Sequence, residues 1–258
     1  MEECDSDRTR WAASATKWDL RFVGERHGTG EFPRLLSDLA SNVARHGPVV
    51  VAVELADDAQ SANVEYLTSE GSIEDRMRLL STPSWQRSDG RASLAMLALM
   101  DDLRHLVRGG ADVGIDVFDV EPQGDPQSVR YQLTRERLLA DRLLDIRRRG
   151  TTLVLTGNVH AELSARADAP RGFVPAAALI ATEVSLVSIV GRRSGGESWC
   201  TLPVDGRLVT AAHGVDGTNL GDEPYIDLEP STHGYRGVAY VGRITPSPPA
   251  SKLDRPPT

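Results

Sequence analysis

The feature that most constrains this chain is an unbroken apolar run at residues 49–53, four valines and one alanine, which ends directly on Glu54. β-Branched residues favour extended structure, and an apolar run without polar alternation is typical of a strand covered on both faces. Such strands belong to parallel sheets that are flanked by helices. We therefore expect the carboxylate of Glu54 to leave such a sheet at the carboxyl end of its strand.

Polar side chains also follow the ends of other strand-like segments. These segments are short, rich in valine, leucine or isoleucine and bounded by glycine or charged residues, and they occupy residues 19–23, 111–118 and 151–156. The first runs into Glu25 and His27, and the last runs into His160. Polar residues that could carry chemistry thus follow three separate strands.

Segments with apolar residues at helical spacing lie between these strands. They cover residues 31–46, 57–70, 72–80, 91–108 and 126–149. Strands that alternate with helices in this way predict an α/β fold with a mostly parallel sheet and helices on both faces.

The domain organisation follows from changes in composition. We expect residues 1–16 to be a disordered lead-in and residues 17–244 to form a single α/β domain. Its last part, residues 193–244, is a strand-rich extension with glycine-rich loops, and residues 245–258, with five prolines, form a tail. The later predicted strands are residues 183–192, 197–202 and 237–244.

The charge and cysteine content exclude several classes of protein. A net charge of -8 and a pI near 5.3 argue against a surface that binds nucleic acid. Cys4 and Cys200 form neither a disulfide framework nor a paired metal motif. The sequence shows no signal peptide and no apolar stretch long enough to span a membrane, so we expect a cytoplasmic protein without a membrane partner. The oligomeric state is left open.

Glu25, His27, Glu54 and His160 would share one edge of the sheet if their strands are parallel neighbours. Two histidines and a carboxylate can bind a divalent transition metal and leave a position open for water, with His27, Glu54 and His160 as ligands. The same side chains can also act without metal, with one imidazole as general base. Both chemistries indicate hydrolysis. A buried Glu54 needs a partner in either case, which would be a metal, a histidine or an arginine.

Four segments together resemble a known superfamily. Gly24-Glu25-Arg26-His27 begins the first, Val53-Glu54 is the second, Arg135 opens the third, and Gly157-Asn158-Val159-His160 is the fourth. The sequence thus has two Gly-x-x-His motifs, with a strand-end glutamate between them and a helix arginine before the second motif. This arrangement resembles that of the superfamily that unites erythromycin esterases, haem-binding ChaN lipoproteins, and the Tiki and TraB proteins. The resemblance covers about residues 18–165.

The resemblance implies an α/β fold with a site at the carboxyl edge, and it implies several functions. Erythromycin esterases are metal-independent hydrolases that use a histidine and glutamate pair, Tiki proteins are metal-dependent proteases, and ChaN binds haem. The spacing from Glu25 to His27 is one residue shorter than in most of the esterases and closer to the ChaN type.

Our leading hypothesis is a hydrolase for a small organic ester or amide. His27 would be the base or a metal ligand, with Glu25 and Glu54 orienting it or completing a site for Mn, Fe, Co or Zn. His160 would be a ligand or an acid, and the resemblance makes Arg135 the residue that steadies a substrate carboxylate or the oxyanion. The alternatives are binding of haem or another cofactor, and a lyase of a biosynthetic pathway that uses the same site.

Overall fold

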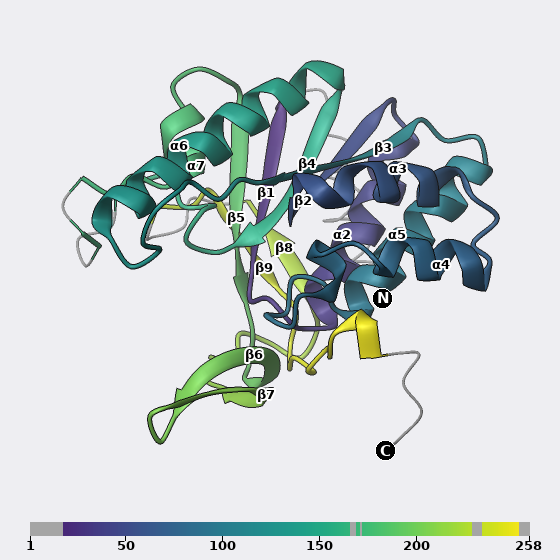
Figure 1. Ribbon diagram of the computed structural model, residues 1–258. Coiled ribbons are helices and arrows are strands. Elements are labelled where there is room, and N and C mark those ends of the chain that lie inside the picture. Colours follow the sequence, from purple (N-terminus) through teal and green to yellow (C-terminus); the bar gives the residue numbers. More distant parts are fainter. Residues whose placement is uncertain (1–17, 166–168, 171, 229–233, 253–258) are drawn as a thin grey trace.

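The computed structural model describes residues 18–165, 169–170, 172–228 and 234–252, so the expected lead-in at residues 1–16 lies outside the described residues. The main sheet has seven strands in the order β3-β2-β4-β1-β5-β9-β8 (Figure 1). Its strands are β1 Leu20–Glu25, β2 Val49–Ala56, β3 Val113–Asp119, β4 Thr151–Gly157, β5 Leu186–Arg192, β8 Tyr225–Asp227 and β9 Gly237–Tyr240.

All neighbouring strands in this sheet are parallel except β8 and β9, which are antiparallel. β1 lies between β4 and β5, and β4 lies between β1 and β2. The registers place Glu25 beside Gly157 and Val53 beside Leu155. The carboxyl ends of β1, β4 and β2 therefore meet at one edge, as the sequence predicts.

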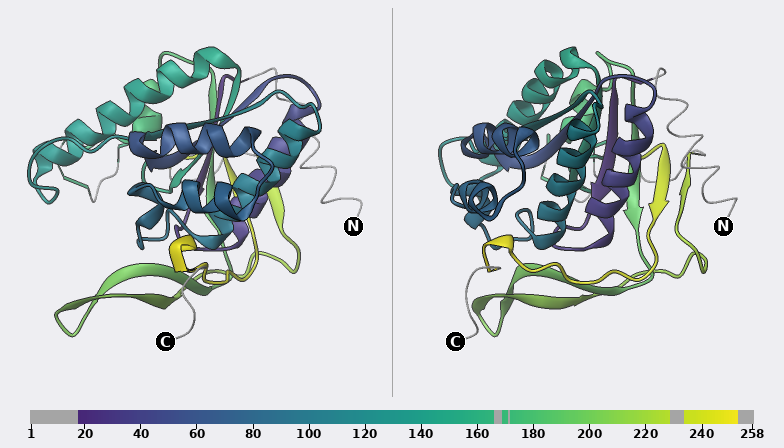
Figure 2. Two further views of the ribbon diagram at one scale, coloured as in Figure 1. Left: turned by 45° about the vertical axis from the view of Figure 1, so that its right-hand side comes forward. Right: turned by 90° about the vertical axis from the view of Figure 1, so that its right-hand side faces the viewer.

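Helices cover both faces of the sheet (Figure 2). One face packs against α2 Glu31–Ala44, α3 Gln60–Thr68, α4 Ile73–Leu80 and α5 Leu94–Arg108, and the other against α6 Val129–Ile146 and α7 Ala176–Ile180. Neighbouring residues of β1 show the division, since Val23 belongs to the first core and Phe22 to the second. The predicted α/β fold is confirmed.

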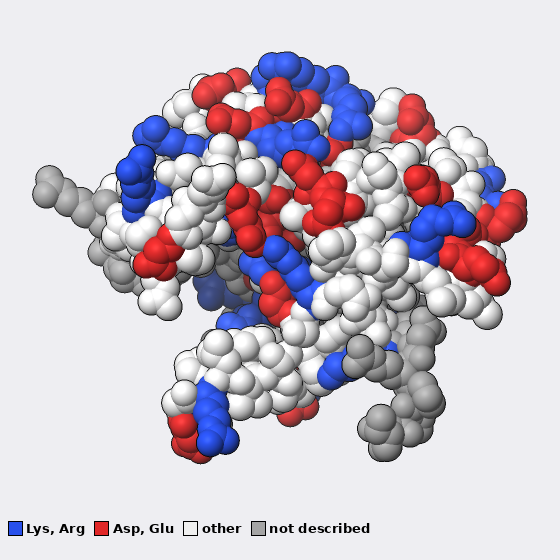
Figure 3. Space-filling view, viewed as in Figure 1, with Lys and Arg blue, Asp and Glu red and all other residues white. Residues whose placement is uncertain are grey.

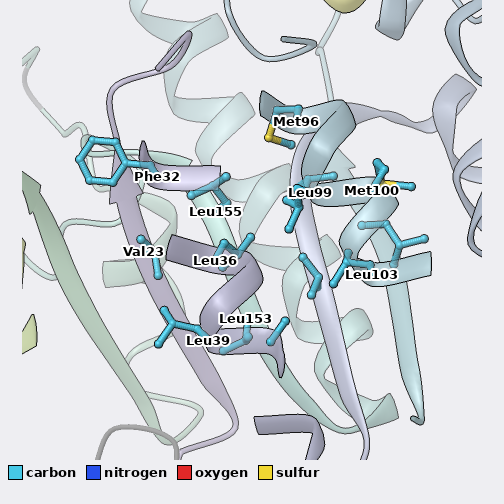
Figure 4. Packing of buried hydrophobic residues seen from close by; sticks show 14 of the residues in the cluster. Val23, Phe32, Leu36, Leu39, Met96, Leu99, Met100, Leu103, Leu153 and Leu155 are labelled. Carbon is cyan, nitrogen blue, oxygen red and sulfur yellow. The ribbon is translucent and has the colours of Figure 1, made fainter. Parts of the chain in front are cut away.

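The larger core joins α2 and α5 to the sheet. Leu36 and Leu39 of α2 and Leu99 of α5 are buried with Val23 and Leu155 of the sheet (Figure 4). Both helices present apolar residues at spacings of three and four, which places them on one helical face. Short 3-10 turns complete the helical elements: η2 Asp57–Ala59, η3 Ser84–Gln86, η4 Arg147–Arg149 and η5 Ala250–Lys252.

A two-stranded hairpin projects from the body of the molecule (Figure 1). Its strands are β6 Gly196–Val204 and β7 Arg207–Val215, paired antiparallel. The sequence predicts only the first of these strands. Asp205 and Gly206 both have positive φ, 49° and 75°, which is the two-residue turn that Asp-Gly favours in hairpins. That dipeptide is the sequence signal for β7.

Residues 245–252 belong to the segment expected to be a tail, and they pack along the body. Ala250 is fully buried, and its backbone N–H donates to Ala92 O over 2.9 Å. Earlier in this segment, Gly30 N donates to Thr245 O over 3.0 Å. We call residues 245–252 the C-terminal strap.

No helix within the described ranges combines the length and the apolar character that crossing a membrane requires.

Candidate active site

The first motif forms the turn that leaves β1. Nδ1 of His27 lies 2.8 Å from Oε1 of Glu25, so the carboxylate orients the imidazole. Gly28 follows with φ of 73°, and a Cβ there would collide with the backbone of Trp199. Gly28 N donates to Gly90 O over 3.1 Å, and Gly28 O accepts from Trp199 N over 2.8 Å. The turn that carries His27 is thus fixed by two distant parts of the chain.

Glu54 lies at the centre of the site and is 4% exposed. Its Oε1 atom accepts from Arg91 Nε and Arg135 Nη2, both over 3.0 Å. Its Oε2 atom accepts from Thr156 Oγ1 over 2.7 Å and from Gly157 N over 3.0 Å. Each carboxylate oxygen therefore has two donors, which is the compensation that a buried charge requires.

The two histidines approach this carboxylate from the carboxyl ends of two adjacent strands, β1 and β4. Nε2 of His27 lies 3.5 Å from Glu54 Oε2, and Nε2 of His160 lies 3.7 Å from Glu54 Oε1. Gly157 lies between the rings, because a Cβ added to it would be 3.2 Å from His27 Nε2 and 3.7 Å from His160 Cδ2. The second motif has glycine at this position because a side chain would fill the space between the imidazoles.

His160 has its own carboxylate and its own arginine. Nδ1 lies 2.7 Å from Glu136 Oε1, and Nε2 lies 3.0 Å from Nη1 of Arg135. Glu136 is buried, and its second oxygen accepts from Ala176 N over 2.8 Å. A guanidinium only donates, so Nε2 of His160 is an acceptor and the proton of the neutral ring lies on Nδ1.

The arginines are held by further carboxylates. Arg135 Nη2 lies 2.6 Å from Asp119 Oδ1 as well as contacting Glu54. Arg91 Nη1 lies 2.6 Å from Asp89 Oδ2. Both guanidinium groups therefore bridge two acids, and their positions are fixed.

The charges around Glu54 determine its protonation and that of His27. Burial raises the pKa of Glu54, but His160, Arg91, His27 and Arg135 outweigh burial and hold that pKa well below the usual value of 4.5. Burial lowers the pKa of His27, but the carboxylates of Glu54 and Glu25 outweigh it and raise that pKa above the usual 6.5. Glu54 is therefore a carboxylate at neutral pH, and His27 holds its proton more firmly than an ordinary imidazole does.

A cavity of about 590 Å³ opens beside this network. Its walls carry charged groups from the network together with Tyr131, Val159 and Phe173. Figure 3 shows acidic and basic side chains close together near the hollow above the β6–β7 hairpin. The charged residues that line the cavity are Arg87, Asp89, Arg91, Asp119, Glu121, Arg135, Glu136 and His160.

The structure brings together the five residues that the sequence singled out, namely Glu25, His27, Glu54, Arg135 and His160. Arg91, Asp119 and Glu136 are the further residues that hold these five in place. Glu136 lies three and seven residues before Leu139 and Leu143 on the buried face of α6. A glutamate in an apolar helical stripe was the signal that could have found it.

The expected metal ligands do not match a metal site well. Among the described residues, no group of three or more His, Cys, Asp or Glu side chains is arranged to hold a metal ion. Both oxygens of Glu54 are saturated by donors, and two of these donors are cationic guanidinium groups that would repel a metal cation. His160 likewise has both ring nitrogens engaged, so it is not open as an axial ligand for haem. Metal and haem binding stay predictions from the sequence.

No protein-family model and no curated protein matches this sequence. Solved structures do match. A mutant of the erythromycin esterase EreC in its open conformation aligns with a TM-score of 0.68 and 10% identity over 90% of this chain and 92% of that one. A structural-genomics protein from Bacillus cereus aligns with a TM-score of 0.64 and 9% identity over 93% and 92%.

ChaN of Campylobacter jejuni, solved with cofacial haem, gives a TM-score of 0.40 and 11% identity over 70% of this chain and 84% of that one. The esterase alignment shows that the chain has the erythromycin-esterase-like fold that its motifs predict. Identities this low show the fold and leave the activity to be argued from the site.

Proposed function

We propose that this protein is a metal-independent hydrolase for a small organic ester or amide, with His27 as the general base. One observation carries the proposal. Glu25 holds Nδ1 of His27, and in the part of the chain that the structure describes Nε2 has no closer acid than Glu54 Oε2, at 3.5 Å. A base needs one ring nitrogen oriented and the other available, and His27 meets this requirement where His160 does not.

The carboxylates beside His27 make it a stronger base. Glu54 and Glu25 together raise the pKa of His27 above its usual 6.5. The unprotonated ring takes a proton from water at Nε2, and the nearby carboxylates stabilise the imidazolium that forms. The hydroxide then attacks the carbonyl carbon of the substrate to give a tetrahedral intermediate. This intermediate collapses with cleavage of the C–O or C–N bond, and the His27 imidazolium returns its proton to the leaving alcohol or amine.

Arg135 supplies the positive charge that this attack requires. It lines the cavity and is fixed by Glu54, Asp119 and His160, so it does not have to move when negative charge develops on the carbonyl oxygen. Glu54 holds Arg135 and Arg91 in place. Its lowered pKa makes it a poor proton acceptor, so we assign it a positioning role.

The cavity supports a small-molecule substrate. A volume of about 590 Å³ is within the range of pockets for small ligands, roughly 300–1,000 Å³. Tyr131, Val159 and Phe173 offer apolar contacts, whereas the charged wall offers polar ones. The shared fold with an erythromycin esterase supports ester hydrolysis as the reaction.

The test is turnover of a panel of small esters and amides in water enriched in ¹⁸O. We expect label in the carboxylate product and a loss of about 10²–10⁴-fold in kcat for His27→Ala. His46→Ala removes an exposed histidine away from the site and is the matched control, with unchanged kcat. Product without label would indicate a lyase, and full activity of folded His27→Ala would refute the assignment of the base.

A further inference from the structure

A second group of charged residues lies on the other side of His27. Arg26 lies directly before His27, at the end of β1, and Arg192 ends β5 and is followed by Arg193. β1 and β5 are parallel neighbours, with Val23 paired with Ile189. These three arginines therefore follow the ends of two adjacent strands, β1 and β5. Glu54 and His160 belong to the ends of β2 and β4, which lie on the other side of β1.

A cavity of about 320 Å³ lies beside Arg192 and Arg193. Thr218 N donates to Arg193 O over 2.9 Å, which fixes one wall of this cavity against β5. Figure 3 shows basic side chains deep in the hollow between the body and the β6–β7 hairpin. The cavity is lined by Arg192, Arg193, Asp216, Gly217, Thr218 and Leu220.

These arginines differ from those of the active site in their partners. Within the described ranges, none of the three forms an ion pair with an acid, whereas Arg91 and Arg135 each contact two acids. Arg26 donates to Ser198 Oγ over 3.3 Å and to Cys200 Sγ over 3.8 Å.

The inner part of the Arg193 side chain is shielded from water. Its Nε atom is buried, and no hydrogen-bond partner is found for it in the described part of the chain. Burial together with the like charges of Arg26 and Arg192 lowers the pKa of Arg193, and the charge of Asp216 only partly offsets this. A chain with a net charge of -8 thus concentrates positive charge at one cavity.

We propose that Arg26, Arg192 and Arg193 form a subsite that binds a small oxyanion, the carboxylate or phosphate group of an organic ligand. Guanidinium groups bind both anions through charge-assisted hydrogen bonds. A bound anion would supply the negative charge that no acid of the described residues supplies to these arginines through an ion pair. Because Arg26 adjoins His27, the anionic group would belong to the molecule that is hydrolysed. This last step rests on the proposed function, whereas anion binding itself does not.

Calorimetric titration of the full chain with inorganic phosphate and, separately, with succinate tests the subsite, with sodium chloride holding ionic strength constant. We expect binding of at least one of the two anions, and the stronger binder identifies the preferred group. Arg193→Gln and Arg192→Gln should each weaken it about tenfold, since a hydrogen bond to a charged group contributes roughly 1.5–3 kcal/mol. Arg193→Lys should retain part of the affinity.

Arg78→Gln is the matched control, because Arg78 is an exposed arginine of α4 that pairs with Asp75. Its anion affinity should equal that of wild type. If neither anion binds, or if the Arg192 and Arg193 variants bind as wild type does, the subsite does not exist. Circular dichroism of each variant ensures that loss of binding is not loss of fold.

Two further measurements separate the subsite from the reaction. His27→Ala should bind the anion as wild type does, so failure of hydrolysis leaves the subsite standing. Where hydrolysis is found, Arg193→Gln should raise KM for an ester that carries a carboxylate. For the neutral analogue of that ester, the same variant should change neither kcat nor KM. Equal effects on both esters would refute the subsite as a substrate-binding element.

Discussion

Nη1 of Arg135 lies 3.0 Å from Nε2 of His160, so the arginine occupies the ring nitrogen through which His160 would otherwise act as a base. His160 and Glu136 then form a support for the arginine, and His27 with Glu25 forms the chemically available pair. Two histidines that look equivalent in the sequence, each closing a Gly-x-x-His motif, thus have different surroundings.

Arg135→Gln should lower kcat about 10²–10³-fold, because one fixed donor to the developing oxyanion is lost. Steady-state kinetics on the ester found in the substrate screen measures this loss. Arg137→Gln changes an exposed arginine two residues further along the same helix and should leave kcat unchanged. Equal kcat in the two variants would exclude Arg135 from the reaction.

The rate should rise with pH as His27 loses its proton. The base must be unprotonated, and its neighbours raise its pKa above 6.5, so the rising limb of kcat/KM is expected above pH 6.5. The pH–rate profile measures this limb. Glu25→Gln removes one of the carboxylates that raise the pKa, and it should shift the limb to lower pH. A limb below pH 6.5 in wild type would contradict the assignment.

Gly157→Ala should reduce kcat strongly while the fold persists. Gly157 does not have a positive φ, so alanine is compatible with the backbone, but its methyl group would lie 3.2 Å from His27 Nε2 and displace the attacking water. Gly114→Ala is the control, since its Cβ would meet only Val50 at ordinary contact distance, 3.8 Å. Activity of Gly157→Ala similar to that of Gly114→Ala would show that the space between the imidazoles is not used.

Glu54→Gln should lower the free energy of unfolding by about 3–5 kcal/mol, because it removes a buried charge that two partly buried guanidinium groups share. Urea denaturation measures the loss, and Glu65→Gln on the exposed side of α3 should change little. The pKa of Glu54 is lowered on folding, so its stabilising contribution is complete above about pH 4.5. It is lost as the pH falls through the folded-state value. The stability difference between wild type and Glu54→Gln should therefore shrink in acid.

Protein purified without chelator or affinity metal should contain well below one equivalent of manganese, iron, cobalt or zinc. The reason is the saturated Glu54, whose donors include Arg91 and Arg135. Elemental analysis measures the content. Nearly one equivalent of one of these metals in wild type, lost in His27→Ala, would contradict this prediction. It would support the metal site predicted from the strand ends.

The residues that sequence reasoning found follow a local rule. Glu25, Glu54 and His160 each come at or just after the end of an apolar strand, and parallel pairing brings strand ends together whatever their separation along the chain. Arg91 obeys no such rule. It lies in a loop 37 residues from Glu54, between η3 and α5, and the packing of these two elements in the larger core brings it to that carboxylate.

The fold of the last part of the chain was harder to predict for a different reason. β7 has little alternation of apolar and polar residues, and its Leu208 is 77% exposed. A ribbon that buries little has no need of the hydrophobic pattern from which strands are predicted. The Asp205-Gly206 turn, which is typical of a hairpin, indicates β7 instead.

The C-terminal strap and the hairpin determine when the site can form. Ser247 N and Trp199 N both donate to Gly28 O, and Leu94 N, just after the loop that carries Arg91, donates to Pro248 O. A ribosome makes the strand that bears His27 long before it makes these partners. The nascent chain can therefore assemble most of its sheet while the turn at Gly28 lacks these bonds. The turn that carries His27 gains both of these bonds only after residue 248 has left the exit tunnel.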